Sequence, residues 1–150
     1  MRSMKQSGRI SLLALGSVAC VVLVAALMLF SRESAASAGA RFMFALQNHD
    51  VNTLTKMTMM AGASDEDIRK QWDFSVNNAE KYYLFAYKIE GASQANDTTA
   101  SVKVRMIKDS DKPGSYDTLT EMPLVKEKDK DDWKVYVRGL SRDFYPCLPR

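Results

Sequence analysis

The sequence Y-Y-L-F-A-Y-K-I occupies residues 82–89, and A-S-V-K-V-R-M-I occupies residues 100–107. In both stretches the side-chain character alternates with a period of two, which is typical of β-strands. The second stretch places small and apolar residues on one face and mainly polar residues on the other, so it predicts an antiparallel strand with one buried and one wet face. Residues 91–97 lie between the two strands and predict a turn, because they contain glycine, asparagine and aspartate.

Two further strands are expected toward the C-terminus. D-S-D-K-P-G at residues 109–114 predicts a second turn. A third strand follows at about residues 116–128, where Pro123 indicates an edge, a bulge or a break. Mixed charges at residues 126–132 predict a solvated hairpin loop, and a fourth strand is expected at residues 133–139. The apolar face of this last strand is Trp133, Val135 and Val137.

Three helices are expected before the strands. The first carries an apolar stripe at helical spacing that ends before His49. Asp50 is expected to cap a second, short helix. Ser64 and Asp67 form a capping box, which predicts a third helix ending at about residues 78–81. The stripe of the first helix is Ala38, Phe42, Ala45 and Leu46. The apolar face of the third is Ile68, Trp72, Val76 and Ala79.

Helices that precede an antiparallel meander indicate an α+β fold. We therefore predict a cone-like domain over residues 40–150, with about three helices packed on a curved four-stranded antiparallel sheet that wraps over the first and third helices. Because twisted sheets curl, we expect a pocket between the concave face and the helices. The aromatic residues that are candidates to line it are Trp72, Tyr83, Phe85, Tyr87 and Tyr136.

A membrane anchor is expected before this domain. The run from Ile10 to Phe30 contains 21 residues and no charge. Such a helix is roughly 31 Å long, which matches a hydrocarbon core of ~30 Å, so we expect it to lie in the lipid bilayer. Basic residues precede it in the flank at residues 1–9, and this bias predicts a cytoplasmic N-terminus and a periplasmic or extracellular C-terminal domain. Residues 31–39 are then a juxtamembrane tether or the first turn of a helix.

Two alternatives to a retained anchor are considered. Small residues at positions 36, 38 and 40 fit a signal-peptide cleavage site, but the apolar region of a signal peptide is usually only about 7–15 residues long. S-V-A-C at residues 17–20 resembles a weak lipobox, but ten apolar residues follow Cys20, where a lipoprotein would carry a polar tether. The length of the apolar run favours the retained anchor.

The charge balance gives no sign of a nucleic-acid partner. Residues 1–30 contain three of the 21 basic residues and no acidic one, so the rest of the chain holds 18 of each sign. A nucleic-acid-binding domain normally shows an excess of basic residues, so we do not expect this domain to bind nucleic acid. The two cysteines, Cys20 and Cys147, are expected in different phases and so do not pair with each other. A bridge from Cys147 to another chain is left open.

Three sequence features resemble the nuclear-transport-factor-two-like superfamily. They are F-x-x-A-L-x-x-x-D-x-x-x-L at residues 42–54, the capped helix around Trp72, and the closing W-K-V-Y-V at residues 133–137. Within that group the chain is similar to small bacterial cell-envelope domains of unknown function, over about residues 35–145. The resemblance implies a cystatin-like α+β fold. Some members are ketosteroid-isomerase-like enzymes with a pocket carboxylate and a tyrosine, and the residues that would take those roles here are Asp73, Tyr83, Tyr87 and Tyr136.

No catalytic or metal-binding motif is expected. The spacing of those four residues matches no catalytic motif, and aromatic residues on alternate strand positions are more often core. His49 is the single histidine and stands beside Asp50, but a helix C-terminal imidazole is the simpler interpretation of it. One histidine and one outer cysteine do not fill a transition-metal shell. We therefore expect no catalytic residue, no metal and no cofactor.

The sequence thus predicts a non-enzymatic domain, anchored in the membrane of the cell envelope, that binds a protein partner or a small apolar ligand. A scaffold subunit of an envelope assembly is the more specific form of this hypothesis, since bitopic inner-membrane components of type IV secretion machines share the layout of an anchor and an outer domain. The alternative is a small-molecule enzyme, isomerase- or dehydratase-like, that uses the pocket between sheet and helices.

Overall fold

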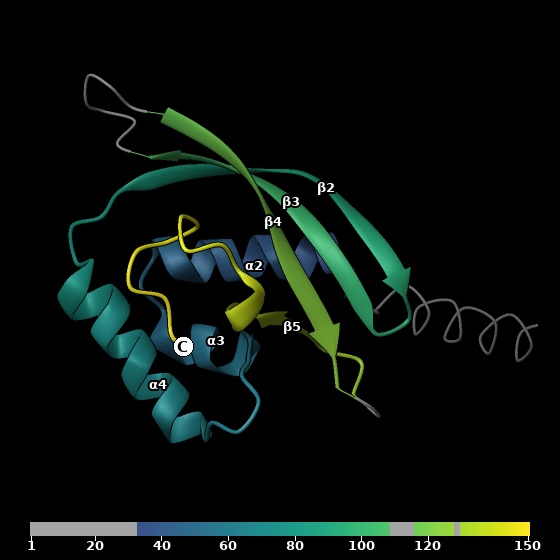
Figure 1. The fold of residues 1–150 in the computed structure, drawn as a ribbon, viewed down its shortest axis with the longest axis horizontal. Coiled ribbons are helices and arrows are strands. Elements are labelled where there is room, and N and C mark those ends of the chain that lie inside the picture. The colour runs from purple at the N-terminus through teal and green to yellow at the C-terminus, as the bar shows by residue number, and fades with distance from the viewer. Residues whose placement is uncertain (1–32, 109–115, 128–129) are drawn as a thin grey trace, which may run out of the picture. The chain divides into compact units, whose positions relative to one another are not determined.

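The computed structural model describes residues 33–108, 116–127 and 130–150, and Figure 1 shows their arrangement. The basic flank at residues 1–9, the predicted transmembrane helix at residues 10–30 and the predicted turn at residues 109–114 lie outside these ranges. Within the ranges, no helix is both long enough and apolar enough to cross a membrane. The described residues belong to one compact domain, Glu33–Arg150.

The first described helix is α2 (Ala35–Gln47), which begins after Ser34. The hydroxyl of Ser34 accepts a hydrogen bond from the backbone N–H of Ser37 and so caps the helix. The packed domain therefore includes residues 35–39, for which a tether or a first helical turn was expected, and the helical turn is what forms. The predicted stripe is confirmed as buried: Ala38, Phe42, Ala45 and Leu46.

Two shorter helices follow, α3 (Val51–Met57) and α4 (Asp65–Asp73). Both predicted N-caps are confirmed, because Asp50 accepts from the N–H of Thr53 and Ser64 accepts from the N–H of Asp67. The capping groups lie within three residues of the donors they satisfy, so local sequence was enough to locate both helix starts.

The predicted third helix changes its geometry before it ends. After α4 the chain forms a π-helix, η1 (Phe74–Ala79), in which the N–H of Glu80 donates to the carbonyl of Ser75. Val76 stays buried, but Ala79 is exposed, so the prediction for Ala79 was wrong. The reason is the i→i+5 bonding, which adds a residue to the turn and rotates Ala79 off the buried face.

The sheet has five strands in the order β1-β5-β4-β3-β2. Their bounds are β1 Thr58–Met59, β2 Phe85–Asn96, β3 Thr99–Lys108, β4 Tyr116–Lys126 and β5 Trp133–Tyr136. The prediction of a four-stranded antiparallel sheet was therefore incomplete: β1 pairs in parallel with β5, which makes the sheet mixed. A strand of two residues is too short to show any alternation in the sequence.

The pairing of β2 with β3 corrects the predicted turn at residues 91–97. β2 continues to Asn96, with register irregularities between Ile89 and Gly91 and again before Asn96, and only Asp97 and Thr98 form the turn. Pairing along the whole of β3 overrides the weak strand propensity of the glycine- and serine-containing segment. The predicted alternation of β3 is confirmed, with Ala100, Val102, Val104 and Met106 buried.

Pro123 lies in β4 next to the point where pairing with β5 stops. β5 pairs with β4 from Leu124 to Lys126, so Pro123 stands just beyond the paired segment, at an edge as predicted. β5 is shorter than expected, because a 3₁₀ turn, η2 (Val137–Gly139), follows it. A Cβ atom at Gly139 would lie 3.0 Å from Pro123 Cγ, so the return of the chain past β4 needs a glycine.

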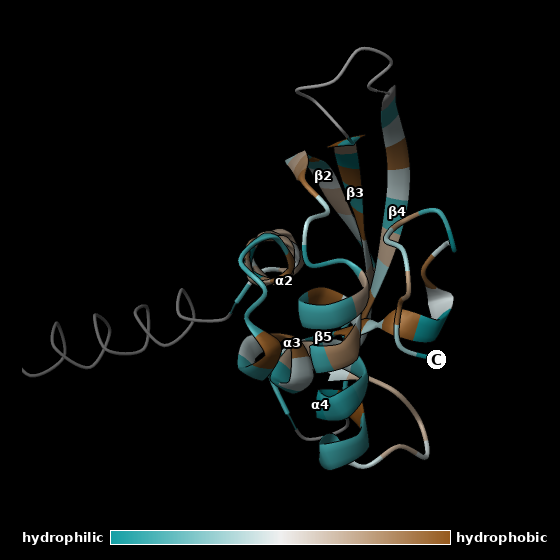
Figure 2. Cartoon of the chain, turned by 90° about the vertical axis from the view of Figure 1, so that its left-hand side faces the viewer, coloured by the Kyte–Doolittle hydropathy of each residue, from teal (hydrophilic) through white to brown (hydrophobic). Residues whose placement is uncertain are grey.

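The strands β2, β3 and β4 curve over α2 (Figure 1). Gly39 allows α2 to approach β3 and β4 closely, since a Cβ atom at Gly39 would lie 3.0 Å from side-chain carbons of both Met122 and Val102. Figure 2 shows the bands of hydrophobic and hydrophilic residues that alternate along β3 and β4. The sheet was predicted to wrap over the first and third helices. This is confirmed for the first helix, α2, whereas α4 packs mainly against α3.

Candidate functional site

The space in which a pocket was predicted is occupied by the C-terminal segment, residues 140–150. Phe144 and Tyr145 are 0% and 1% exposed, and Leu140 and Leu148 are also buried. Polar contacts hold the segment at both sides: Ser75 Oγ donates to the carbonyl of Cys147, and Lys108 Nζ donates to the carbonyl of Asp143. The backbone N–H of Arg150 donates to Gln71 Oε1 at 2.9 Å.

Three of the five aromatic pocket candidates form a cluster with this segment. The ring of Tyr145 lies edge-on to Tyr83, with centroids 5.3 Å apart, and edge-on to Phe85 at 6.1 Å. Tyr87 is tilted against Phe85 at 6.4 Å, and its hydroxyl donates to the carbonyl of Ala40. Edge-to-face packing of this kind is typical of a core cluster, so these rings fill space rather than line a cavity.

The other two candidates lie elsewhere. Trp72 is fully buried, edge-on to Phe42 at 5.8 Å, and its Nε1–H donates to Thr58 Oγ1 at 2.8 Å. Trp72 therefore ties α4 to β1. Tyr136 is 39% exposed and ends β5, where its ring lies against Gly139. The structure thus does not bring the five predicted residues together around one pocket.

Asp73 and His49, the other residues considered for chemistry, have local structural roles. Asp73 is exposed and accepts from Asn77 Nδ2 one turn further along the chain. His49 has a left-handed backbone, with φ 55°, at the end of α2. The two N–H groups that follow α2 donate backward, His49 to Leu46 and Asp50 to Ala45, which is the Schellman arrangement.

Asp50 is held in its ionised form by the helix it caps. Its carboxylate accepts from both the N–H and the hydroxyl of Thr53, and these hydrogen bonds lower the pKa of Asp50. A carboxylate stabilised in this way is a weak base. Among the residues that the structure describes, no group of three histidine, cysteine, aspartate or glutamate side chains could hold a metal ion.

Two polar side chains are buried at the contact between the sheet and the C-terminal segment. Lys108 is 4% exposed, and burial lowers its pKa while nearby Asp143 raises it. The hydroxyl of Tyr145 is buried without a hydrogen-bond partner, and burial raises the pKa of Tyr145 well above its usual value. Sequence reasoning missed both groups because nothing along the chain indicated what would cover β3.

A groove of about 490 Å³ lies on the surface between α2, α3 and the start of β5. Phe44 stands at its side, 62% exposed. The charges around the groove are mixed. Its charged lining residues are Arg41, Asp50, Lys56, Asp132 and Lys134. The groove was missed in the sequence, although a large apolar residue outside the stripe of α2 was a signal for it.

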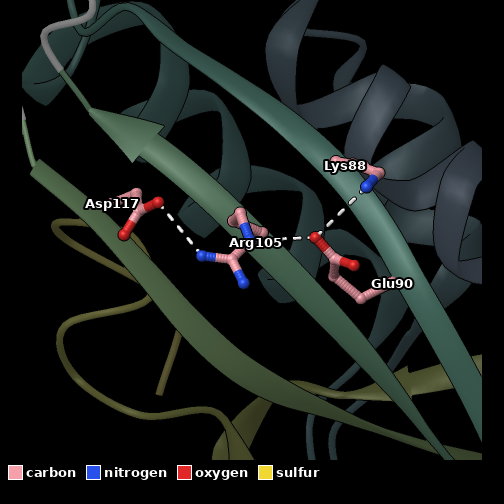
Figure 3. A network of polar contacts seen from close by, with 4 residues as sticks. All are labelled: Lys88, Glu90, Arg105 and Asp117. Carbon is pink, nitrogen blue, oxygen red and sulfur yellow. Dashed lines mark hydrogen bonds and ion pairs between the residues drawn. The ribbon is translucent and has the colours of Figure 1, made fainter.

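The outer face of the sheet carries a polar network, drawn in Figure 3. Arg105 Nε lies 2.9 Å from Glu90, and Arg105 Nη1 lies 3.0 Å from Asp117, so one side chain of β3 links β2 to β4. Lys88 Nζ is 3.5 Å from the same oxygen of Glu90. Hydrogen bonding to Arg105 lowers the pKa of Glu90, and hydrogen bonding to Glu90 and Asp117 raises that of Arg105.

These exposed ion pairs contribute little to stability, but they hold the guanidinium of Arg105 in one orientation. Two exposed apolar residues of the outer face flank it, Ile107 on the same strand and Leu119 opposite Arg105 in the β3–β4 register. The arrangement is an exposed sheet surface with an oriented guanidinium and apolar neighbours.

Comparison with known proteins gives a likeness in fold but none in sequence family. No protein-family model matches the sequence, and no curated protein is similar to it in sequence. The fold is similar to the crystal structure of a SEC-C motif containing protein from Psychrobacter arcticus, with 14% identity and a TM-score of 0.47. The match covers 73% of this chain and 62% of that chain, so the chain spans less than two thirds of that protein's length. The resemblance to the nuclear-transport-factor-two-like superfamily stays a prediction.

Proposed function

We propose that the domain is a non-enzymatic binding module for a protein partner, and that residues 10–30 hold it at a membrane of the cell envelope. The observation that carries this proposal is the position of the C-terminal segment. Phe144 and Tyr145 fill the space that a ligand or substrate would need between sheet and helices. Binding at the surface is then favoured over binding in a pocket, and a protein partner over a small apolar ligand.

The outer face of β2, β3 and β4 is the surface that best fits a protein partner. Arginine is enriched at protein interfaces, and the fully buried core of an interface is more apolar than the rest of the protein surface. Arg105 is already oriented by its ion pairs, so it loses less conformational freedom on binding, and Leu119 beside it is 55% exposed. An exposed sheet surface of this kind suits a scaffold that holds one subunit against another.

A matched pair of leucine variants tests the binding surface. Leu119→Asp should abolish crosslinking of the full-length protein to its partner in membranes. Leu84→Asp should leave the crosslink in place, since Leu84 is a similarly exposed leucine that lies just before β2. Both variants should keep the melting temperature of the wild type. Equal crosslinking of the two variants would count against the outer face as the partner surface.

The anchor is tested separately by fractionation. An apolar run of 21 residues should keep the intact chain in the membrane pellet after washing at alkaline pH. Protease added outside the cytoplasmic compartment should digest the domain. Recovery of the full-length chain in the soluble fraction would overturn the membrane part of the proposal and leave the binding surface to be judged by the leucine pair.

A further inference from the structure

Glu33 is held in the domain by a contact of its backbone and a contact of its side chain. The carbonyl of Glu33 accepts a hydrogen bond from Trp133 Nε1 at 3.1 Å, and its carboxylate pairs with Arg41 at 2.8 Å. Trp133 is itself buried, so this contact belongs to the packed domain rather than to a loose tail. Only two residues, 31 and 32, therefore separate Glu33 from the end of the predicted transmembrane run at Phe30.

The reach of this link is short. Three Cα-to-Cα steps span at most ~11 Å, even when the chain is fully extended. The polar layer of one leaflet is roughly 5–7 Å thick, and a compact domain of this size is roughly 30–35 Å across. With residues 10–30 in the bilayer, as proposed above, Glu33 lies no more than a few ångströms beyond the headgroups, and this short link favours an orientation in which its side of the domain faces them.

Parts of three segments come together on that side. Lys126 ends β4, and its ammonium lies 4.7 Å from the centre of the Trp133 ring. The N–H of Lys126 donates to the carbonyl of Thr98 in the turn between β2 and β3, at 2.8 Å. The start of α2, the β2–β3 turn and the described part of the β4–β5 loop therefore form one end of the domain, which we name the tether end.

We propose that the tether end is a membrane-contacting surface that rests on the phospholipid headgroup layer. The inference rests on the proposed anchor and adds the orientation of the domain to it. The charges of this end suit a headgroup that carries both signs. They alternate at close spacing: Arg41 pairs with Glu33, Lys126 lies 3.7 Å from Asp131, and Lys130 pairs with Glu127. Each pair can exchange with the phosphate and the ammonium of a zwitterionic phospholipid.

The two ends of β2 provide label positions at different distances from the tether end, and these can test the orientation. Asp97 follows β2 at the tether end, and Tyr82 precedes it at the far end, 85% exposed. Twelve strand residues separate the two positions by roughly 35 Å. Lys130, exposed in the β4–β5 loop, is a second position at the tether end.

The experiment uses the full-length chain in phosphatidylcholine vesicles, with Cys20→Ala and Cys147→Ser as background. A nitrobenzoxadiazole label is placed on Asp97→Cys, Lys130→Cys or Tyr82→Cys, and quenching by headgroup-spin-labelled lipid is measured. Labels at positions 97 and 130 should be quenched at least about threefold more than the label at position 82, because only they lie near the headgroup layer.

Two results would overturn the inference, and they are distinguishable. If the protein floats with the vesicles and resists alkaline extraction, but the three labels are quenched equally or position 82 most, the anchor stands and the orientation is wrong. If the protein is extracted from the vesicles, the anchor itself fails, and the orientation fails with it. Circular dichroism of each labelled chain confirms that the domain is folded in every case.

Discussion

His49 follows the C-cap of α2, in a conformation that glycine adopts most easily. Its φ of 55° lies in the left-handed region, which costs a residue with a Cβ atom roughly 1–2 kcal/mol. The position is the C′ residue of a Schellman motif, where glycine is the usual choice. The single histidine of the chain therefore occupies a backbone position that glycine would fill with less strain.

We expect His49→Gly to raise the free energy of unfolding by about 0.5–1 kcal/mol, because the strain is removed and only part of the gain is lost to unfolded-state entropy. Urea denaturation of the domain measures the change. Gly62→Ala is the control with the opposite sign: φ is +80° at Gly62, and no atom stands in the way of a Cβ, so any loss comes from the backbone alone. If His49→Gly instead lowers the free energy of unfolding, the imidazole of His49 makes a stabilising contact.

Tyr145→Phe is expected to stabilise the domain by about 1 kcal/mol at neutral pH, since a buried hydroxyl without a partner carries its full desolvation cost. The gain should grow in alkali. Burial raises the pKa of Tyr145 above its unfolded value near 10, so the folded state keeps its proton while the unfolded chain begins to lose it. The titration of Tyr145 thus leaves the free energy of unfolding of the wild type unchanged below about pH 10 and lowers it above that pH. The Tyr145→Phe variant lacks this decrease.

Unfolding curves at pH 7 and pH 10.5 separate the two effects for Tyr145→Phe. The difference between variant and wild type should be larger at the higher pH. A variant that is less stable than the wild type at pH 7 would mean that the hydroxyl is hydrogen-bonded in solution. The matching change Tyr136→Phe, at a partly exposed ring, should have little effect at either pH.

Helix α4 depends on its cap more than on its composition. It is a short and mostly polar helix that buries only Ile68 and Trp72. Ser64 satisfies the N–H of Asp67 and also donates to the Asp67 carboxylate at 2.7 Å. Three acidic residues in the first turn interact favourably with the helix dipole.

We expect Ser64→Ala to lower the free energy of unfolding by about 1 kcal/mol, the usual contribution of an N-cap hydroxyl. Ser37→Ala is the matched control, because Ser37 lies exposed in the first turn of α2, and it is the hydroxyl of Ser34 that caps that helix. Thermal melts of the two variants give the comparison. A loss as large in Ser37→Ala would indicate that the hydroxyl at position 64 has no special role.

The C-terminal segment completes the core of the whole domain. Burying Phe144, Tyr145 and Leu148 contributes about 1.5–3 kcal/mol for each side chain, which together is comparable to the ~5–15 kcal/mol that usually stabilises a domain. The segment has no regular secondary structure, so its place in the core follows from burial alone.

We therefore expect deletion of residues 144–150 to abolish cooperative thermal unfolding. Deletion of Arg150 alone removes one backbone hydrogen bond to Gln71 and should change the melting temperature little. Differential scanning calorimetry distinguishes the two truncations. If the longer truncation still melts cooperatively and binds an apolar dye in the vacated space, the segment is a removable cover, and the ligand-binding and enzymatic alternatives regain support.

Much of the fold could be predicted from neighbouring residues. The caps at Asp50 and Ser64 and the buried face of β3 depend on groups a few positions apart, so their patterns are visible in the chain itself. The candidate site could not be predicted in the same way. The aromatic residues were recognised as a group, but whether they lined a pocket or filled a core depended on Tyr145, about 60 residues further along.

Features that depend on distant partners were absent from the sequence patterns. β1 exists because Thr58 and Met59 meet β5 more than 70 residues later, and Lys108 is buried because the chain returns to cover it with Asp143. Periodicity and capping indicate which helix or strand a segment can form, since they depend on local hydrogen bonds and on which face of the element is apolar. Only packing determines what covers that side, because burial is a property of the folded chain as a whole.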